Sequence, residues 1–204
     1  MRTDPEADER RLAWDERHKA GDFEGRGPNP TLVDALRGIR PGRALELACG
    51  SGTNAVWLAG RGWRVTAVDW SQVGLDNGRA KADRAGVAVE WLRRDLFDWT
   101  PPVRAFDLVA LAYLHLPIEE RGPVYARAAA AVASGGRLVV VGHDRTHAAT
   151  GIPGPDPDRL FTAAELGAEL AAADPELRVE RAEAVRQPIP EPSPIDALLV
   201  VRRS

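Results

Sequence analysis

The chain has 204 residues, 44% of them hydrophobic and 28% charged, and a formal net charge of −3 at pH 7. This length and composition are typical of one soluble domain with a sizeable core. The acidic balance argues against nucleic-acid binding, and apolar runs as short as 138–141 argue against a membrane span. One cysteine cannot form an internal disulfide, and residues 1–11 carry no apolar signal segment, so we expect a cytoplasmic protein. No cysteine–histidine cluster has zinc spacing, so no metal is expected.

The first 36 residues are predicted to form a helical lid segment, followed by a single domain at 37–204. Residues 1–11 are highly charged and are expected to be disordered or frayed. Short helices are expected at 14–19 and 30–36, separated by a glycine- and proline-rich hinge.

From residue 43 onward, strands and helices alternate. Strands are predicted at 43–48, 64–69 and 87–92, with helices at 54–59 and 72–85 between them. This order is typical of parallel strands joined by crossover helices.

The second of these two helices has clear ends and a weakened middle. Ser71 is its predicted N-cap, and Gly86 its predicted end. Gly74 and Gly78 lie inside it, where each costs about 1 kcal/mol relative to alanine.

Four more strands are predicted in the second half, at 106–112, 137–142, 178–185 and 195–202, the second of them preceded by a turn at 134–136. The run at 106–112 is apolar throughout, as in strands covered on both faces.

Two more helices are predicted between these strands. The first, at 117–132, is expected to break at Gly122-Pro123, and the second, at 162–172, opens with a capping-box pattern. Residues 143–161 are expected to be a loop, and a proline-rich link at 188–194 separates the last two strands without a helix. The fold class is therefore α/β: a doubly wound, mostly parallel seven-stranded, Rossmann-like sheet with an antiparallel C-terminal strand pair.

The most informative segment is the glycine-rich turn after the first strand, which reads ELACGSG from Glu46 to Gly52. Glycines there allow a ligand to approach the backbone, and the following helix offers unpaired N–H groups. Asp69 ends the next strand, where a carboxylate accepts hydrogen bonds from ribose hydroxyls, and Asp95 follows the third strand, where it can bind a purine amino group. Three successive strand ends are expected to line one crevice for a nucleotide-like ligand.

Two ligand classes fit this pattern. Gly50, Gly52 and Ala55 also match G-x-G-x-x-A, the fingerprint of nicotinamide dinucleotide sites, with Asp69 about 20 residues further on. Glu46 argues against a dinucleotide because its charge would repel a pyrophosphate, whereas it could accept from an ammonium group. The closing strand pair is also not the second mononucleotide half of a dinucleotide fold.

The segment resembles the class I S-adenosylmethionine-dependent methyltransferases, whose first motif is E/D-x-G-x-G-x-G, with Ala48 here in place of the first glycine. Within that class, the runs CGSGTNAVWLAGRGWRVTAVD, FDLVALAYLHL and RLFTAAEL are similar to small-molecule enzymes of the tellurite-resistance type. Trp14 and Arg17 match the N-terminal W-x-x-R-Y helix of that group, with His18 at the tyrosine position.

The resemblance implies S-adenosyl-L-methionine as cofactor and S-adenosyl-L-homocysteine as product. It implies that Glu46 holds the methionine amino group and Asp69 the ribose. The remaining implied contacts run from the loop to the strand ends and the N-terminal helix: Ala48, Gly50 and Gly52 along methionine and ribose, Asn54 near the carboxylate, Trp70, Asp95 and Leu96 at ribose and adenine, Leu111 at the methionine chain, and Trp14 and Arg17 as a cover.

Candidate catalytic residues follow the fourth and fifth predicted strands. His115, His143 and Tyr113 could act as a base or orient an acceptor, because a histidine can accept a proton near neutral pH. We expect methyl transfer to a small-molecule nucleophile (S, N, O or a metalloid oxyanion), with no nucleic-acid or membrane partner. The alternatives are an NAD(P)-dependent oxidoreductase and a cofactor-binding protein that transfers no methyl group. The sequence indicates no oligomeric state.

Overall fold

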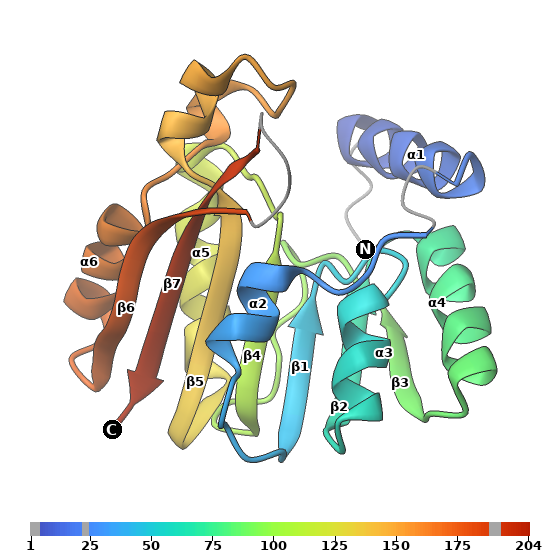
Figure 1. The fold of residues 1–204 in the computed structure, drawn as a ribbon, viewed down its shortest axis with the longest axis horizontal. Coiled ribbons are helices and arrows are strands. Elements are labelled where there is room, and N and C mark those ends of the chain that lie inside the picture. The colour runs from blue at the N-terminus through green and yellow to red at the C-terminus, as the bar shows by residue number, and fades with distance from the viewer. Residues whose placement is uncertain (1–4, 22–24, 188–192) are drawn as a thin grey trace. The chain divides into compact units, whose positions relative to one another are not determined.

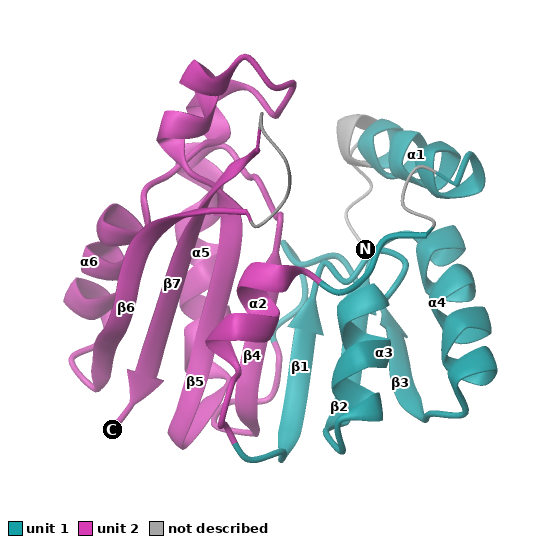
Figure 2. Cartoon of the chain, viewed as in Figure 1, with its two compact units in different colours: residues 1–28, 40–100 teal, residues 29–39, 101–204 magenta. Residues whose placement is uncertain are grey.

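The structure is a computed structural model that describes residues 5–21, 25–187 and 193–204. The chain forms two compact units, shown in different colours in Figure 2. Unit 1 comprises residues 1–28 and 40–100, and unit 2 comprises residues 29–39 and 101–204.

Unit 1 contains three parallel strands, in which β2 pairs with both β1 and β3. Its elements in chain order are α1 (Pro5–Lys19), β1 (Arg43–Leu47), α3 (Thr53–Gly60), β2 (Arg64–Asp69), α4 (Gln72–Ala85) and β3 (Val89–Arg93). The apolar residues of β1 and β2 are buried, as expected for strands covered on both faces.

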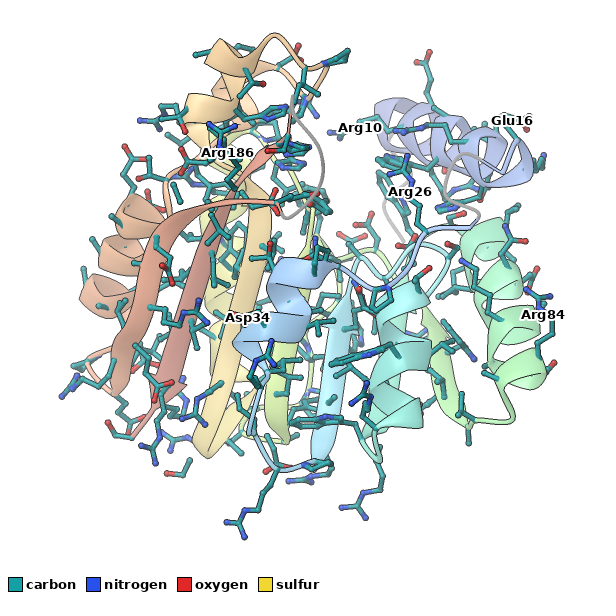
Figure 3. All side chains as sticks on the ribbon, in the orientation of Figure 1. Arg10, Glu16, Arg26, Asp34, Arg84 and Arg186 are labelled. Atoms are coloured by element: carbon teal, nitrogen blue, oxygen red, sulfur yellow. The ribbon has the colours of Figure 1, made fainter. Side chains whose placement is uncertain are left out.

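Unit 2 contains four strands, of which β4 and β5 are parallel and β7 is antiparallel to both β5 and β6. Its elements are α2 (Pro30–Ala35), β4 (Phe106–Ala112), α5 (Ile118–Ala130), β5 (Val132–His143), the 3₁₀ turns η1 (Arg145–Thr150) and η2 (Pro157–Arg159), α6 (Ala163–Ala173), β6 (Leu177–Arg186) and β7 (Ile195–Arg203). Figure 1 shows α2 in front of this part of the sheet and α5 behind it. On the outside of the unit, Asp34 of α2, labelled in Figure 3, accepts from Arg181 of β6 at 3.4 Å.

The strand order is β3-β2-β1-β4-β5-β7-β6. This confirms the predicted fold class, a doubly wound, mostly parallel seven-stranded sheet that closes with an antiparallel strand pair. Among the described residues, no helix is both long and apolar enough to cross a bilayer.

Three predictions differ most from the structure. Helix α1 begins at Pro5, where residues up to 11 were expected to be disordered; proline fits the first helical turn, and Arg11 pairs with Asp8 and Asp15 along the helix. Helix α5 runs through Pro123 without a break. Because proline has no backbone N–H, the hydrogen bond to the carbonyl of Glu119, four residues earlier, is missing. That carbonyl lies in the first turn, so little of the helix is affected.

The third difference concerns β5, which begins at Val132 although a turn was expected at 134–136. Gly135 has φ +77°, and the pairing with β4 shifts register between Phe106 and Leu108. The predicted turn is therefore a local irregularity inside a longer strand. Residues 188–192 of the predicted proline-rich link lie outside the described residues.

The two internal glycines of α4 have a packing role. A Cβ on Gly78 would lie 2.5 Å from the Trp91 ring, and one on Gly74 would lie 2.9 Å from the Gly50 carbonyl oxygen. The two glycines lower the helix propensity of α4, but they leave room for β3 and for the loop after β1 to pack against it. Its ends match the prediction, with Ser71 capping Gly74 N–H and Gly86 in the left-handed conformation.

Candidate functional site

The loop between β1 and α3 has an unusual backbone. Ala48, Gly50 and Gly52 all have positive φ, at 53°, 54° and 65°. For alanine this left-handed conformation costs roughly 1–2 kcal/mol. The family that the sequence resembles has glycine at the position of Ala48, and the backbone conformation there favours glycine.

Cys49 lies within this loop and is 8% exposed. Burial, followed by the nearby Asp69 and Glu46 carboxylates, raises the pKa of the thiol well above its ordinary value. The thiol is therefore protonated and unreactive while the loop keeps this conformation.

Glu46 projects from β1 at the base of the loop and is only 2% exposed. Its Oε1 accepts from Asn54 Nδ2 at 3.0 Å, whereas its Oε2 is buried and has no hydrogen-bond partner among the described residues. Burial raises the pKa of Glu46 to about 7. The Asn54 side chain and the Ala55 backbone N–H oppose this rise in the pKa. A buried carboxylate oxygen without a donor is costly, so a ligand donor at Oε2 would stabilise it.

Asp69 ends β2 and ties the loop to that strand. Its Oδ2 accepts from Gly50 N and its Oδ1 from Ser71 N, both at 2.8 Å. Burial raises the pKa of this carboxyl also. Each oxygen retains a second lone pair, which a ligand hydroxyl can use.

Two residues of α1 that were not proposed as site residues from sequence hold it in place: Asp15 contacts the N-cap of α4, and His18 contacts the loop. Asp15 Oδ1 accepts from Ser71 Oγ at 2.5 Å. His18 is 4% exposed, and a Cβ on Gly50 would lie 3.3 Å from its ring. The match of His18 to the tyrosine position of the family helix was the signal available for finding it.

The predicted cover residues Trp14 and Arg17 lie on the more exposed side of α1. Trp14 is 37% exposed, and the Arg17 guanidinium lies 4.5 Å from its ring centre. Their contact with a cofactor stays a prediction.

The ends of β2 and β3 hold the other predicted residues of unit 1. Trp70 is half-buried, and its carbonyl accepts from Arg93 Nε at 3.1 Å. Asp95 Oδ1 accepts from Phe97 N at 2.9 Å, which fixes the turn that contains Leu96. These residues are positioned locally, and their role at adenine stays a prediction.

Unit 2 gathers the catalytic candidates into one group of side chains, here called the histidine cluster: Tyr113, His115, His143, His147 and Asp196. The ring of His143 stacks on that of His147, with centres 4.2 Å apart, and on that of His115, at 5.3 Å. Tyr113 lies 5.0 Å from the His143 ring. The structure therefore brings together all three residues proposed from sequence.

Asp196 is the central residue of the cluster and was not predicted. It is 0% exposed and accepts from Tyr113 OH at 3.0 Å, Thr31 Oγ1 at 3.1 Å and Gln187 Nε2 at 3.0 Å. Its sequence signal was a lone acid in the apolar strand IDALLVV.

The surroundings of His115 and Tyr113 set the protonation state of these two cluster members. His115 Nε2 accepts from the backbone N–H of His143 at 2.9 Å, and its pKa is lowered to about 4, first by burial and then by the neighbouring His143. Burial and the Asp196 carboxylate raise the pKa of Tyr113. His115 is therefore neutral and Tyr113 a phenol at neutral pH. Tyr113 also has φ +59°, a strained backbone for an aromatic residue.

Leu111, the last predicted cofactor contact, lies in β4 of unit 2 and is wholly buried. Its role stays a prediction. Among the described residues, no group of three or more His, Cys, Asp or Glu side chains is arranged to hold a metal ion.

Comparison with known proteins bears on these sites. Residues 44–136 match a family described as a methyltransferase domain. A 69-residue stretch is 34% identical to ribosomal RNA small subunit methyltransferase C of Alcanivorax borkumensis. That stretch covers 32% of this chain, and the match spans only about a fifth (21%) of the curated relative's length.

Solved structures show the same fold at low identity. The Burkholderia thailandensis 1,6-didemethyltoxoflavin N1-methyltransferase has a TM-score of 0.75 at 20% identity, covering 100% of this chain and 92% of that one. A methyltransferase from Aquifex aeolicus, dependent on S-adenosylmethionine, scores 0.69 at 18% identity, covering 91% and 97%. A TehB-like one from Corynebacterium glutamicum scores 0.65 at 19%, covering 96% and 98%. At these identities the structures show the fold alone, and the family match supports the prediction of a methyltransferase domain over residues 44–136.

Proposed function

We propose that this chain is an S-adenosylmethionine-dependent methyltransferase that binds its cofactor at the loop 46–52 of unit 1. The observation that carries the proposal is Glu46 Oε2, a buried carboxylate oxygen without a hydrogen-bond partner in the described structure. The ammonium group of the methionine moiety would supply the missing donor and charge.

The charge around the loop favours this cofactor over a dinucleotide. Glu46 and Asp69 are both buried, and no lysine or arginine among the described residues forms an ion pair with either. A pyrophosphate would add negative charge beside two buried carboxylates that have no positively charged partner in the described structure. A ligand with an ammonium and a sulfonium group would provide that compensation, so the NAD(P)-dependent oxidoreductase is the weaker candidate.

The other residues of unit 1 fit the remaining parts of the cofactor. Asn54 orients Glu46 through its 3.0 Å hydrogen bond. Asp69 would accept from the ribose hydroxyls with its free lone pairs. The backbone of Ala48, Gly50 and Gly52 would lie along methionine and ribose. Adenine would contact Trp70, Asp95 and Leu96, with Leu111 at the methionine chain and Trp14 and Arg17 as the cover.

When bound, the sulfonium cofactor supplies a methyl group activated for displacement. The protein then has to hold the nucleophile in line and exclude water, which can contribute up to about 7–11 kcal/mol. We assign acceptor handling to His143, His115 and Tyr113. Because His115 Nε2 already accepts from the backbone and Tyr113 stays protonated, we assign the role of base to His143.

We propose a small molecule as acceptor. The toxoflavin-related enzyme, which is similar over the whole chain, is named for such a substrate. The curated relative is named for ribosomal RNA, but the net charge of −3 provides no general attraction for a polyanion. A metalloid oxyanion, as in the tellurite-resistance type, remains within the proposal, although the TehB-like structure scores lower than the toxoflavin-related one.

The test is calorimetric binding of S-adenosylhomocysteine and NAD(P) to the wild type and two variants. We expect S-adenosylhomocysteine alone to bind, and Glu46→Gln to weaken it about 10- to 100-fold, since a charged hydrogen bond contributes about 1.5–3 kcal/mol. Glu90→Gln is the matched control, because this exposed carboxylate of β3 lies in the same unit and accepts only from Thr66 in the described contacts.

Binding of NAD(P) without S-adenosylhomocysteine would contradict the proposal. Tight S-adenosylhomocysteine binding without transfer of a labelled methyl group to any small molecule of a cell extract would support the third possibility, a cofactor-binding protein without activity.

A further inference from the structure

The fold places one histidine and one buried carboxylate side by side in unit 2. His143 is the last residue of β5, and Asp196 is its direct partner across the antiparallel ladder with β7. Residues directly opposite one another project to the same face of a sheet, so the register itself pairs the two side chains. Their closest approach is 3.6 Å, between His143 Nδ1 and Asp196 Oδ1. That is an ion-pair distance, and such contacts often tighten only when substrate binds.

Asp196 is held rigidly in this position. Thr31, Tyr113 and Gln187 all donate hydrogen bonds to its carboxylate. None of these donors carries a positive charge, so the negative charge is solvated but not neutralised. Among the described residues, His143 is the basic side chain that comes within ion-pair distance of this carboxylate.

The groups that face His143 come from every neighbouring element. Tyr113 and His115 follow β4, His147 lies in η1, and Asp196 lies in β7. Because the three imidazoles stack on one another, a charge on one disfavours a charge on the others. Of the three, His143 is the one within ion-pair distance of the carboxylate, and its side chain keeps 19% of its surface exposed, whereas His147 is buried. His143 therefore combines contact with the carboxylate and access to solvent, the two features that a positioned base needs.

We propose that His143 is the catalytic base for methyl transfer and that Asp196 positions it, which assigns the acceptor to the class of N–H or O–H nucleophiles. This inference rests on the proposed methyltransferase function. Asp196 would hold the proton on Nδ1 and stabilise the imidazolium, leaving Nε2 to face the acceptor.

The step balances as follows. A lone pair on the acceptor nitrogen or oxygen forms the bond to the methyl carbon, and the bond between that carbon and the sulfonium sulfur breaks, with its electron pair staying on sulfur. The acceptor proton moves to His143 Nε2, and the imidazolium later releases it to water. A thiol acceptor, already partly ionised near neutral pH, would gain little from such a base.

The experiment measures methyl transfer from labelled S-adenosylmethionine to three probes, a phenol, an aromatic N–H heterocycle and a dithiol, between pH 6 and 9. For the O–H or N–H probe that is methylated, we expect His143→Gln to lower kcat by about 10²- to 10⁴-fold. Asp196→Asn should lower kcat at least about tenfold and move the acidic limb of the pH profile, with KM changing less. Glu183→Gln, an exposed carboxylate of β6, is the control and should behave as wild type.

A second measurement needs no acceptor. In ¹⁵N spectra at high pH, His143 should be the Nδ1–H tautomer, and Asp196→Asn should change that tautomer; His143→Gln identifies the signal, so the assignment holds even if Asp196→Asn folds poorly. An Nε2–H tautomer in the wild type would overturn the inference. So would methylation of the dithiol alone, of no probe, or at rates that His143→Gln leaves unchanged. Wild-type protein that fails to bind S-adenosylhomocysteine would instead defeat the proposed function.

Discussion

Replacing Glu46 by glutamine is expected to change how stability depends on pH. The pKa of this carboxyl is raised from 4.5 to about 7 in the folded chain, mainly by burial. Between those values the folded state keeps a proton that the unfolded state has lost, so the free energy of unfolding falls as pH rises. For these two pKa values, ionisation of Glu46 should lower it by about 2.5 kcal/mol between pH 5 and pH 8.

The assay compares denaturant unfolding of wild type and Glu46→Gln without ligand at both pH values. Glutamine leaves an amide N–H₂ where Oε2 was, but that cost is the same at both pH values and cancels from the difference. The wild type should lose about 2.5 kcal/mol more than the variant, or roughly 5–10 °C in Tm for a chain of this size. If the free energies of unfolding of the two proteins changed in parallel with pH, the raised pKa of the buried Glu46 carboxyl would be refuted.

Three further predictions concern the loop and its supports. Ala48→Gly should leave the protein between unchanged and about 1 kcal/mol more stable, because it relieves the φ of +53° at some cost in chain entropy; denaturant unfolding measures this, and a large loss would contradict the strain. Gly78→Ala should destabilise by about 1–3 kcal/mol against Trp91, and the same change in a Trp91→Leu background should cost less, as a double-mutant cycle would show. Ser71→Ala should cost about 1 kcal/mol as a lost N-cap and raise amide exchange in α1 at residues 8–19, since Ser71 also donates to Asp15; unchanged exchange there would mean that this contact does not hold α1.

Local signals in the sequence were sufficient for much of unit 1. The strand 64–69 and the helix 72–85 match β2 and α4 residue for residue, because β-branched runs, the Ser71 cap and the left-handed Gly86 act within a few residues. The capping box at Thr162 and Glu165 was likewise found at the start of α6. The clustering of Glu46, Gly50 and Asp69 followed from the rule that parallel strands end at one edge.

The remaining features depend on contacts between distant residues. No local pattern pairs His143 with Asp196, because the register of β7 against β5 is set by the whole strand. Helix α5 continues through Pro123, and the next two residues, Val124 and Tyr125, are buried by contacts that a local pattern does not show. The reason for Gly78 became visible only with Trp91 packed against it.

The buried thiol of Cys49 can report on opening of the glycine-rich loop. Because Cys49 is the chain's only cysteine, any reaction with a thiol-specific dye measures how often that one turn opens to solvent. A molecule lodged against the turn would slow the labelling, so occupancy could be followed in unmodified protein and without knowing what becomes methylated.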